Sequence, residues 1–86
     1  MYTVIKRDGR STEFNLTRIS HAITKAFDAT EIPYTPDVIN MLSLQVTADF
    51  APKVKDDKID VESIQDSVEK TLQRAGYDKV AKAYIL

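Results

Sequence analysis

The sequence contains no cysteine, which excludes a disulfide scaffold, a thiolate zinc site and a cysteine nucleophile. A single histidine, His21, is too few for a histidine-rich metal site, and neither an HExxH motif nor an EF-hand loop occurs. With 2 Gly and 3 Pro, the composition is neither collagen-like nor that of a disordered chain. No apolar run reaches the roughly 18 residues of a membrane span, and no secretory signal opens the chain. We therefore expect a cytoplasmic protein with no metal centre, no redox chemistry and no membrane contact.

The 86 residues suffice for one domain, residues 1–86, in which 43% of side chains are hydrophobic and 29% are charged. A chain of this size buries only about 60–70% of its unfolded surface, so any small-molecule site should be shallow. The net charge of −1 disfavours general nucleic-acid binding. Residues 1–30 nevertheless hold five basic and three acidic side chains, against seven and ten in residues 31–86. Positive charge is therefore concentrated at the start of the chain.

The first thirty residues predict a β-hairpin followed by a helix. Tyr, Thr, Val and Ile in residues 2–6 favour a strand, Asp8-Gly9 is a strong two-residue turn signal, and residues 11–14 would form the returning strand. Asn15 can cap a helix over about residues 16–29. The apolar side chains of this helix repeat with the spacing of one buried face, namely Ile19, Ala22, Ile23, Ala26 and Phe27.

A second helix is predicted between two prolines. Thr35-Pro36 combines a capping hydroxyl with a proline suited to the first helical position, and Pro52 ends the helix. A charged loop over residues 52–58 follows. The helix would bury one apolar stripe, formed by Val38, Ile39, Met41, Leu42, Val46 and Phe50.

Two further helices complete the pattern. Asp60 can cap the third helix, and Ala75-Gly76 is a natural stop for it. Residues 77–86 would form the fourth. The inward-facing side chains would be Val61, Ile64, Val68 and Leu72 in the third helix, and Val80, Ala81, Tyr84 and Ile85 in the fourth.

These elements predict an α+β fold that is mostly helical. An N-terminal hairpin, or a small three-stranded sheet if Lys58-Ile59 adds a strand, would lie over a four-helix bundle. Because an isolated hairpin is only marginally stable in water, it must pack across the helices. The fourth helix has no stop signal before the chain ends on apolar residues. We therefore expect this chain to be a fragment of a longer one.

The hairpin carries the most suggestive chemistry. A two-residue turn would place Arg7 opposite Arg10, with Lys6 beside them, and an anion such as a triphosphate would relieve this repulsion. Asn15 and Arg18 lie at the amino end of the first helix, which also favours negative charge. The alternative is a solvated basic turn beside an ordinary helix cap. No P-loop or GxGxxG motif is present, so a nucleotide would have to be held by other means.

Acidic pairs elsewhere do not suggest catalysis. Asp56-Asp57 falls in the predicted charged loop, and Glu62 and Asp66 fall on the polar face of the third helix. We expect these side chains and His21 to face solvent, and we assign no catalytic residue.

The segments VIKRDGR (residues 4–10) and FNLTRI (residues 14–19) resemble the opening of the ATP-cone domain. The later segments IDVESIQD (59–66), Gly76-Tyr77 and VAKAYI (80–85) resemble its second half. ATP-cones are regulatory modules at the N-termini of ribonucleotide reductase large subunits and in the repressor of reductase genes. The resemblance thus implies a non-catalytic domain that senses ATP against dATP and sets reductase activity through oligomeric state.

The resemblance also assigns roles to nine residues of the expected nucleotide site. Val4 and Ile19 would lie near the base, Lys6, Arg7 and Arg18 around the phosphates, Thr12 and Asn15 close to the nucleotide, and Val61 and Gln65 on the far wall. It implies ATP or dATP as effector with Mg²⁺, and as partners the rest of a reductase chain and further copies of it. Two departures concern Gln65, where some members have His, and Thr12, where some have Glu and Glu13 is the neighbouring acid.

The sequence leaves open which kind of protein contains this fragment. The absence of a cysteine-rich zinc ribbon ahead of residue 1 favours a reductase over the repressor. The sequence of residues 4–10 most resembles that of the anaerobic ribonucleoside-triphosphate reductases, with aerobic class I subunits as the alternative. A function of a different class is a protein interaction module that binds no nucleotide and docks through its apolar stripes.

Overall fold

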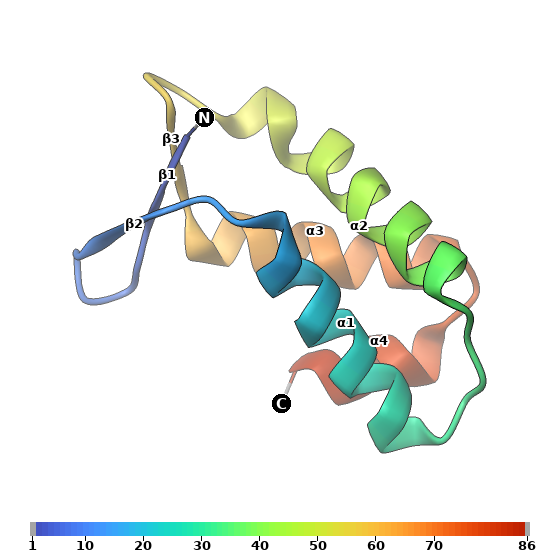
Figure 1. Ribbon diagram of the computed structural model, residues 1–86. Helices are drawn as coiled ribbons and strands as arrows, with labels where there is room; N and C mark the ends of the chain where they lie inside the picture. Colours follow the sequence, from blue (N-terminus) through green and yellow to red (C-terminus); the bar gives the residue numbers. More distant parts are fainter. Residues whose placement is uncertain (1, 86) are drawn as a thin grey trace.

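The computed structural model describes residues 2–85, and it contains the predicted hairpin, the third strand and four helices (Figure 1). The elements in chain order are β1 (Thr3–Ile5), β2 (Ser11–Glu13), α1 (Leu16–Thr30), α2 (Pro36–Phe50), the 3-10 turn η1 (Ala51–Lys53), β3 (Lys58–Asp60), α3 (Val61–Arg74) and α4 (Asp78–Ile85). The sheet lies at one end of the helical bundle (Figure 1). The α+β prediction is confirmed, and the predicted helix end at Leu86 lies outside the described residues. None of the described helices is long and apolar enough to cross a membrane.

The sheet has the strand order β2-β1-β3, with β1 in the centre. Strand β1 runs antiparallel to β2 and parallel to β3, so that Val4 is paired with Thr12 on one side and with Ile59 on the other. Val4 and Ile59 are both buried, and they belong to the same core as the helices. The isolated apolar residue before the third helix is therefore an inward-facing strand residue.

The hairpin turn differs from the predicted one. The Lys6 amide donates to the Arg10 carbonyl at 2.7 Å, and the Gly9 amide donates to the Lys6 carbonyl at 2.9 Å, so the loop has three residues instead of two. Gly9 adopts φ +87°, which matches the left-handed residue that closes a three-residue hairpin loop. Lys6, and not Arg7, therefore stands opposite Arg10, and the predicted Arg7–Arg10 pair is wrong.

The predicted helix caps are confirmed at all three positions. Asn15 Oδ1 accepts from the Thr17 amide at 2.9 Å, and Asp60 Oδ2 accepts from the Ser63 amide at 3.1 Å. Thr35 caps α2 in the same way. These short polar residues satisfy backbone amides that have no partner inside the helix.

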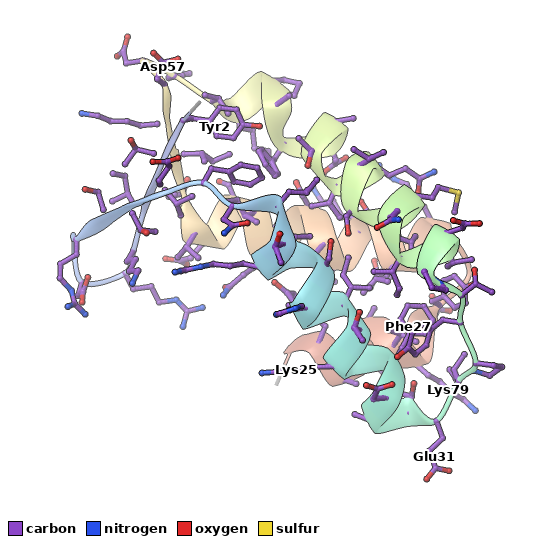
Figure 2. The ribbon with its side chains drawn as sticks, in the orientation of Figure 1. Tyr2, Lys25, Phe27, Glu31, Asp57 and Lys79 are labelled. Carbon is purple, nitrogen blue, oxygen red and sulfur yellow. The ribbon has the colours of Figure 1, made fainter. Side chains whose placement is uncertain are left out.

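One continuous core joins the bundle and the sheet. Phe27 points between the helices, whereas Lys25 of the same helix and Glu31 directly after it point outward (Figure 2). The rings of Tyr2 and Phe14 both contact Phe50 of α2, with centroids 5.9 and 5.6 Å away. This aromatic cluster fixes the sheet to the carboxyl end of α2 and holds the hairpin against the helices.

The predicted apolar stripe of α2 is correct except at Met41. Ile39, Leu42, Val46 and Phe50 are buried, whereas Met41 is 48% exposed. Met41 lies two residues from Ile39, which is about 200° around the helix and so on the opposite side. Its apolar character, and not its position, had suggested burial.

Candidate functional site

A cleft of about 170 Å³ opens where the sheet meets the first turns of α1 and α3. Eight of the nine residues predicted for a nucleotide site line it, namely Val4, Lys6, Thr12, Asn15, Arg18, Ile19, Val61 and Gln65. They come from β1, the hairpin, β2, α1 and α3, which are distant in sequence. The fold therefore brings together the residues that the resemblance had grouped.

Arg7, the ninth residue, is not part of the lining but reaches the edge of the cleft. Its Nη2 donates to Oε1 of Gln65 at 2.8 Å, across 58 positions of sequence. This hydrogen bond joins the tip of the hairpin to α3. Arg10 instead pairs with Asp8: its backbone amide donates to Oδ1 at 3.0 Å, and its Nε lies 2.7 Å from Oδ2. These two hydrogen bonds, that from the amide first, lower the pKa of the Asp8 carboxyl.

The cleft has an apolar floor and a cationic rim. Val4, Ile19 and Ile64 contribute buried side chains, whereas Lys6 and Arg18 are exposed. None of the described carboxylates lies within ion-pair distance of either cation. Their charge is thus available to a ligand, and the arrangement suits a molecule with one flat apolar end and one anionic end.

Two helices begin at this cleft. Asn15, Arg18 and Ile19 belong to the start of α1, and Val61 and Gln65 belong to the start of α3. The amino end of a helix presents free backbone N–H groups and the positive end of its dipole, so the start of α1, which has no acidic residue in its first turn, favours an anion here. The start of α3 is already capped by the Asp60 carboxylate and carries Glu62 in its first turn. The sequence had predicted the contribution of α1.

Further lining residues were not predicted. Ala22 and Ile64 lie on the same helical faces as Ile19 and Val61, so the periodicity of each helix contains the signal that would have found them. Tyr84 of α4 also lines the cleft, and burial raises the pKa of its phenol. Nothing in the local sequence distinguishes Tyr84 from an ordinary core residue.

A wider hollow of about 670 Å³ adjoins the cleft beyond β2. Five of its seven lining residues are shared with the cleft: Thr12, Glu13, Phe14, Asn15 and Arg18. The cleft alone is smaller than the roughly 300–1,000 Å³ typical of ligand sites, but the two spaces together fall within that range. The short strand β2 and the start of α1 therefore border both spaces.

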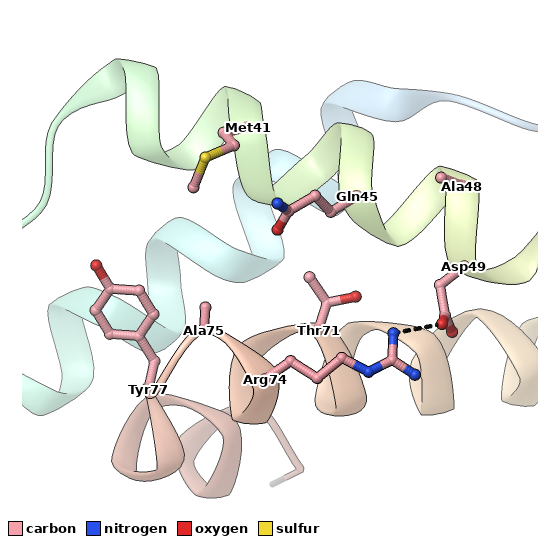
Figure 3. A pocket seen from close by; sticks show the side chains of 8 residues that line it. All are labelled: Met41, Gln45, Ala48, Asp49, Thr71, Arg74, Ala75 and Tyr77. Carbon is pink, nitrogen blue, oxygen red and sulfur yellow. Dashed lines mark hydrogen bonds and ion pairs between the residues drawn. The ribbon is translucent and has the colours of Figure 1, made fainter.

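Another groove, of about 690 Å³, lies between α2 and α3 and shares no lining residue with the cleft (Figure 3). An ion pair between Arg74 Nη1 and Asp49 Oδ1, 2.9 Å apart, spans the two helices at one end of it. Met41 and Tyr77 stand at the other end (Figure 3). This groove was not expected from the sequence.

No group of three or more His, Asp or Glu side chains that could hold a metal occurs in residues 2–85. His21, Asp56-Asp57, Glu62 and Asp66 are exposed, as expected. Glu13 lines the cleft and is itself exposed. Since Mg²⁺ is commonly held by one or two carboxylates together with nucleotide phosphates, the cleft fits a magnesium ion only as part of a magnesium–nucleotide complex.

The sequence pattern of the family described as "ATP cone domain" matches residues 2–86. This chain belongs to the ATP-cone family. The match extends over the segment between residues 30 and 58 as well, where the resemblance noted above was weakest.

Similar proteins include ribonucleoside-diphosphate reductase subunits alpha from Chlamydia pneumoniae, 45% identical over 96% of this chain, and from Chlamydia muridarum, 39% identical over 98%. The anaerobic ribonucleoside-triphosphate reductase of Haemophilus influenzae is 36% identical over 98% of this chain. The ATP-cone spans only 8%, 9% and 12% of the lengths of these relatives. The expected likeness to an anaerobic reductase is therefore found, at lower identity than that to the two Chlamydia subunits.

Proposed function

We propose that this ATP-cone is the regulatory, nucleotide-binding part of a ribonucleotide reductase, and that ATP and dATP compete for the cleft between the sheet and the starts of α1 and α3. The observation that carries the proposal is the cleft itself, with its apolar floor beside exposed Lys6 and Arg18 and with Arg7 at its edge. The domain supplies no catalytic group, and the chemistry would belong to the rest of the reductase.

In this proposal the two ends of the nucleotide meet different surfaces. The adenine base packs on Val4, Ile19 and Val61, which offer apolar area. The phosphates meet Lys6, Arg7 and Arg18, because guanidinium groups match phosphate oxygens and the lysine adds a mobile charge. The ribose lies between them, near Thr12, Asn15 and Gln65. Mg²⁺ would be bound by the phosphates.

The reductase context rests on the relatives. All three named above are reductase chains, and this chain covers a small part of each. We propose that nucleotide occupancy sets overall reductase activity through the oligomeric state of a longer cytoplasmic chain. The identities favour a ribonucleoside-diphosphate type of parent over the anaerobic type suggested by residues 4–10. The reading frame beyond Leu86 would decide this, because a glycyl-radical motif near its end marks the anaerobic class.

Isothermal titration calorimetry tests the binding proposal. ATP and dATP should each bind the ATP-cone with one shared site, and each should displace the other. The titration is run on residues 1–86 and on a longer chain that continues past Leu86, because this chain spans only 8% and 12% of two of its relatives. Absence of binding of both nucleotides to the longer chain would refute the proposal.

A second candidate is an interaction module that binds no nucleotide. The exposed apolar side chains of Met41 and Leu44 on α2, 48% and 61% exposed, favour it. Light scattering separates the two: a nucleotide-regulated domain of the longer chain changes its oligomeric state with ATP or dATP, whereas a simple interaction module keeps the same state with and without nucleotide.

A further inference from the structure

The two arginines at the end of the hairpin have different partners. Arg10 donates its Nε to the carboxylate of Asp8, which is two residues away in the same turn. Arg7 donates Nη2 to the neutral amide oxygen of Gln65, which belongs to α3. One positive charge of the hairpin is therefore balanced by an acid, while the other is held in place by a group that carries no charge.

The Gln65 side chain both lines the cleft and accepts a hydrogen bond from the hairpin. It lines the cleft and is half-buried, and its amide oxygen accepts from Arg7 at 2.8 Å. A guanidinium has five N–H donors in a fixed plane, and Gln65 takes one of them. The other donors and the full positive charge of Arg7 stay available at the edge of the cleft. A carboxylate at the same position would hold Arg7 equally well but would neutralise it.

We infer that Gln65 is a positioning residue, which holds the Arg7 guanidinium over the edge of the cleft before a nucleotide arrives and leaves its charge free for phosphate. This inference rests on the proposed function. It adds that Gln65 acts, through Arg7, on the binding of the nucleotide's phosphates. Anchoring a long side chain in advance removes part of the ordering cost that binding would otherwise pay. The benefit should appear only for ligands that carry phosphates.

The test compares the affinities of ATP and adenosine for five variants, namely Gln65→Ala, Gln65→Glu, Gln73→Ala, Arg7→Ala and the double variant Arg7→Ala/Gln65→Ala. Gln65→Ala should weaken ATP binding roughly threefold to tenfold, because a hydrogen bond to a charged group has a modest net value at an exposed site. It should weaken adenosine binding by clearly less, because adenosine has no phosphate for Arg7 to meet. Gln65→Glu should lower the affinity for ATP by more than Gln65→Ala does, because the new carboxylate neutralises the charge of Arg7 and repels phosphate. Gln73→Ala, an exposed glutamine on the same helix, is the matched control and should change neither affinity. In an Arg7→Ala background, Gln65→Ala should have no further effect on ATP.

Three results would overturn the inference. These are an unchanged or tighter ATP affinity in Gln65→Ala, an equal loss for adenosine, and persistence of the loss in the Arg7→Ala background. Failure of ATP to bind the unsubstituted chain would instead refute the proposed function. A measurement without nucleotide then still tests whether Gln65 holds Arg7 in place. Gln65→Ala should increase the nanosecond motion of the Gly9 amide in ¹⁵N relaxation, and unchanged relaxation would refute the positioning role of Gln65.

Discussion

The isolated ATP-cone should discriminate weakly between ATP and dATP, which differ by the ribose 2′-hydroxyl. A missing hydroxyl lowers affinity strongly only where it leaves a buried partner without a hydrogen bond. None of the polar groups near the predicted ribose position is fully buried, since Thr12 and Gln65 are half-buried and Asn15 and Glu13 are exposed. Asn15 is exposed and its Oδ1 already accepts from the Thr17 amide, while Oε1 of Gln65 already accepts from Arg7. Glu13 is exposed to water.

Water can therefore replace the missing hydroxyl at each of these groups. One net hydrogen bond then contributes about 0.5–1.5 kcal/mol, so the two dissociation constants should differ by less than about tenfold, or roughly 1.4 kcal/mol. Calorimetry with both nucleotides at one salt concentration measures the ratio. Dissociation constants a hundredfold apart would show that the pocket itself recognises the sugar. Larger discrimination in a full reductase would have to arise from assembly, since a ligand shifts an equilibrium only by its differential affinity for the two states.

Other substitutions test the site and the fold. Lys6→Ala should weaken ATP and dATP alike by about 1–3 kcal/mol, because it removes one charged contact to phosphate, whereas Lys79→Ala on the exposed face of α4 should leave calorimetric affinities unchanged. Phe50→Ala should lower the free energy of unfolding in urea by about 3–5 kcal/mol, because the ring is wholly buried, while Leu44→Ala should change it by less than about 0.5 kcal/mol. Hydrogen bonds from the Ser63 side chain and amide lower the pKa of Asp60 in the folded protein. The charged form of Asp60 therefore stabilises the fold at pH values above the ordinary pKa near 4, and this stabilisation is lost as the pH falls below that value. Asp60→Asn keeps the cap and removes this dependence, so urea unfolding of the two proteins should differ more at pH 6 than at pH 3; an equal difference at both would contradict the assignment.

Elements governed by local signals could be predicted from the sequence. The caps at Asn15, Thr35 and Asp60 depend on a side chain and an amide two or three residues away, so they are visible in the sequence. The hairpin turn is also local, but a two-residue and a three-residue loop both place Gly9 at positive φ, and the longer loop is the one that forms. The predicted two-residue loop therefore placed Arg7 opposite Arg10, where the three-residue loop places Lys6.

The cleft could be predicted only in part. Asn15 and Arg18 at the start of α1 were expected from capping and charge, whereas Ile19, Val61 and Gln65 came solely from the family resemblance. Tyr84 was missed because its place in the cleft depends on how α4 packs against the other helices, which no short-range pattern encodes. The partner of Arg7, 58 positions away, depends in the same way on the tertiary fold.

The parallel pairing of β1 with β3 has a consequence for synthesis on the ribosome. Thr3 is paired with Lys58, so one edge of the central strand has no partner until residue 58 has been made and released. The hairpin ends at Glu13, so at roughly 5–20 residues per second that edge stays open for about 2–9 s after the hairpin emerges. The α3 wall of the cleft follows directly after β3 in the chain. A nascent chain thus cannot form the cleft before most of the domain has left the exit tunnel, and its response to nucleotide begins only then.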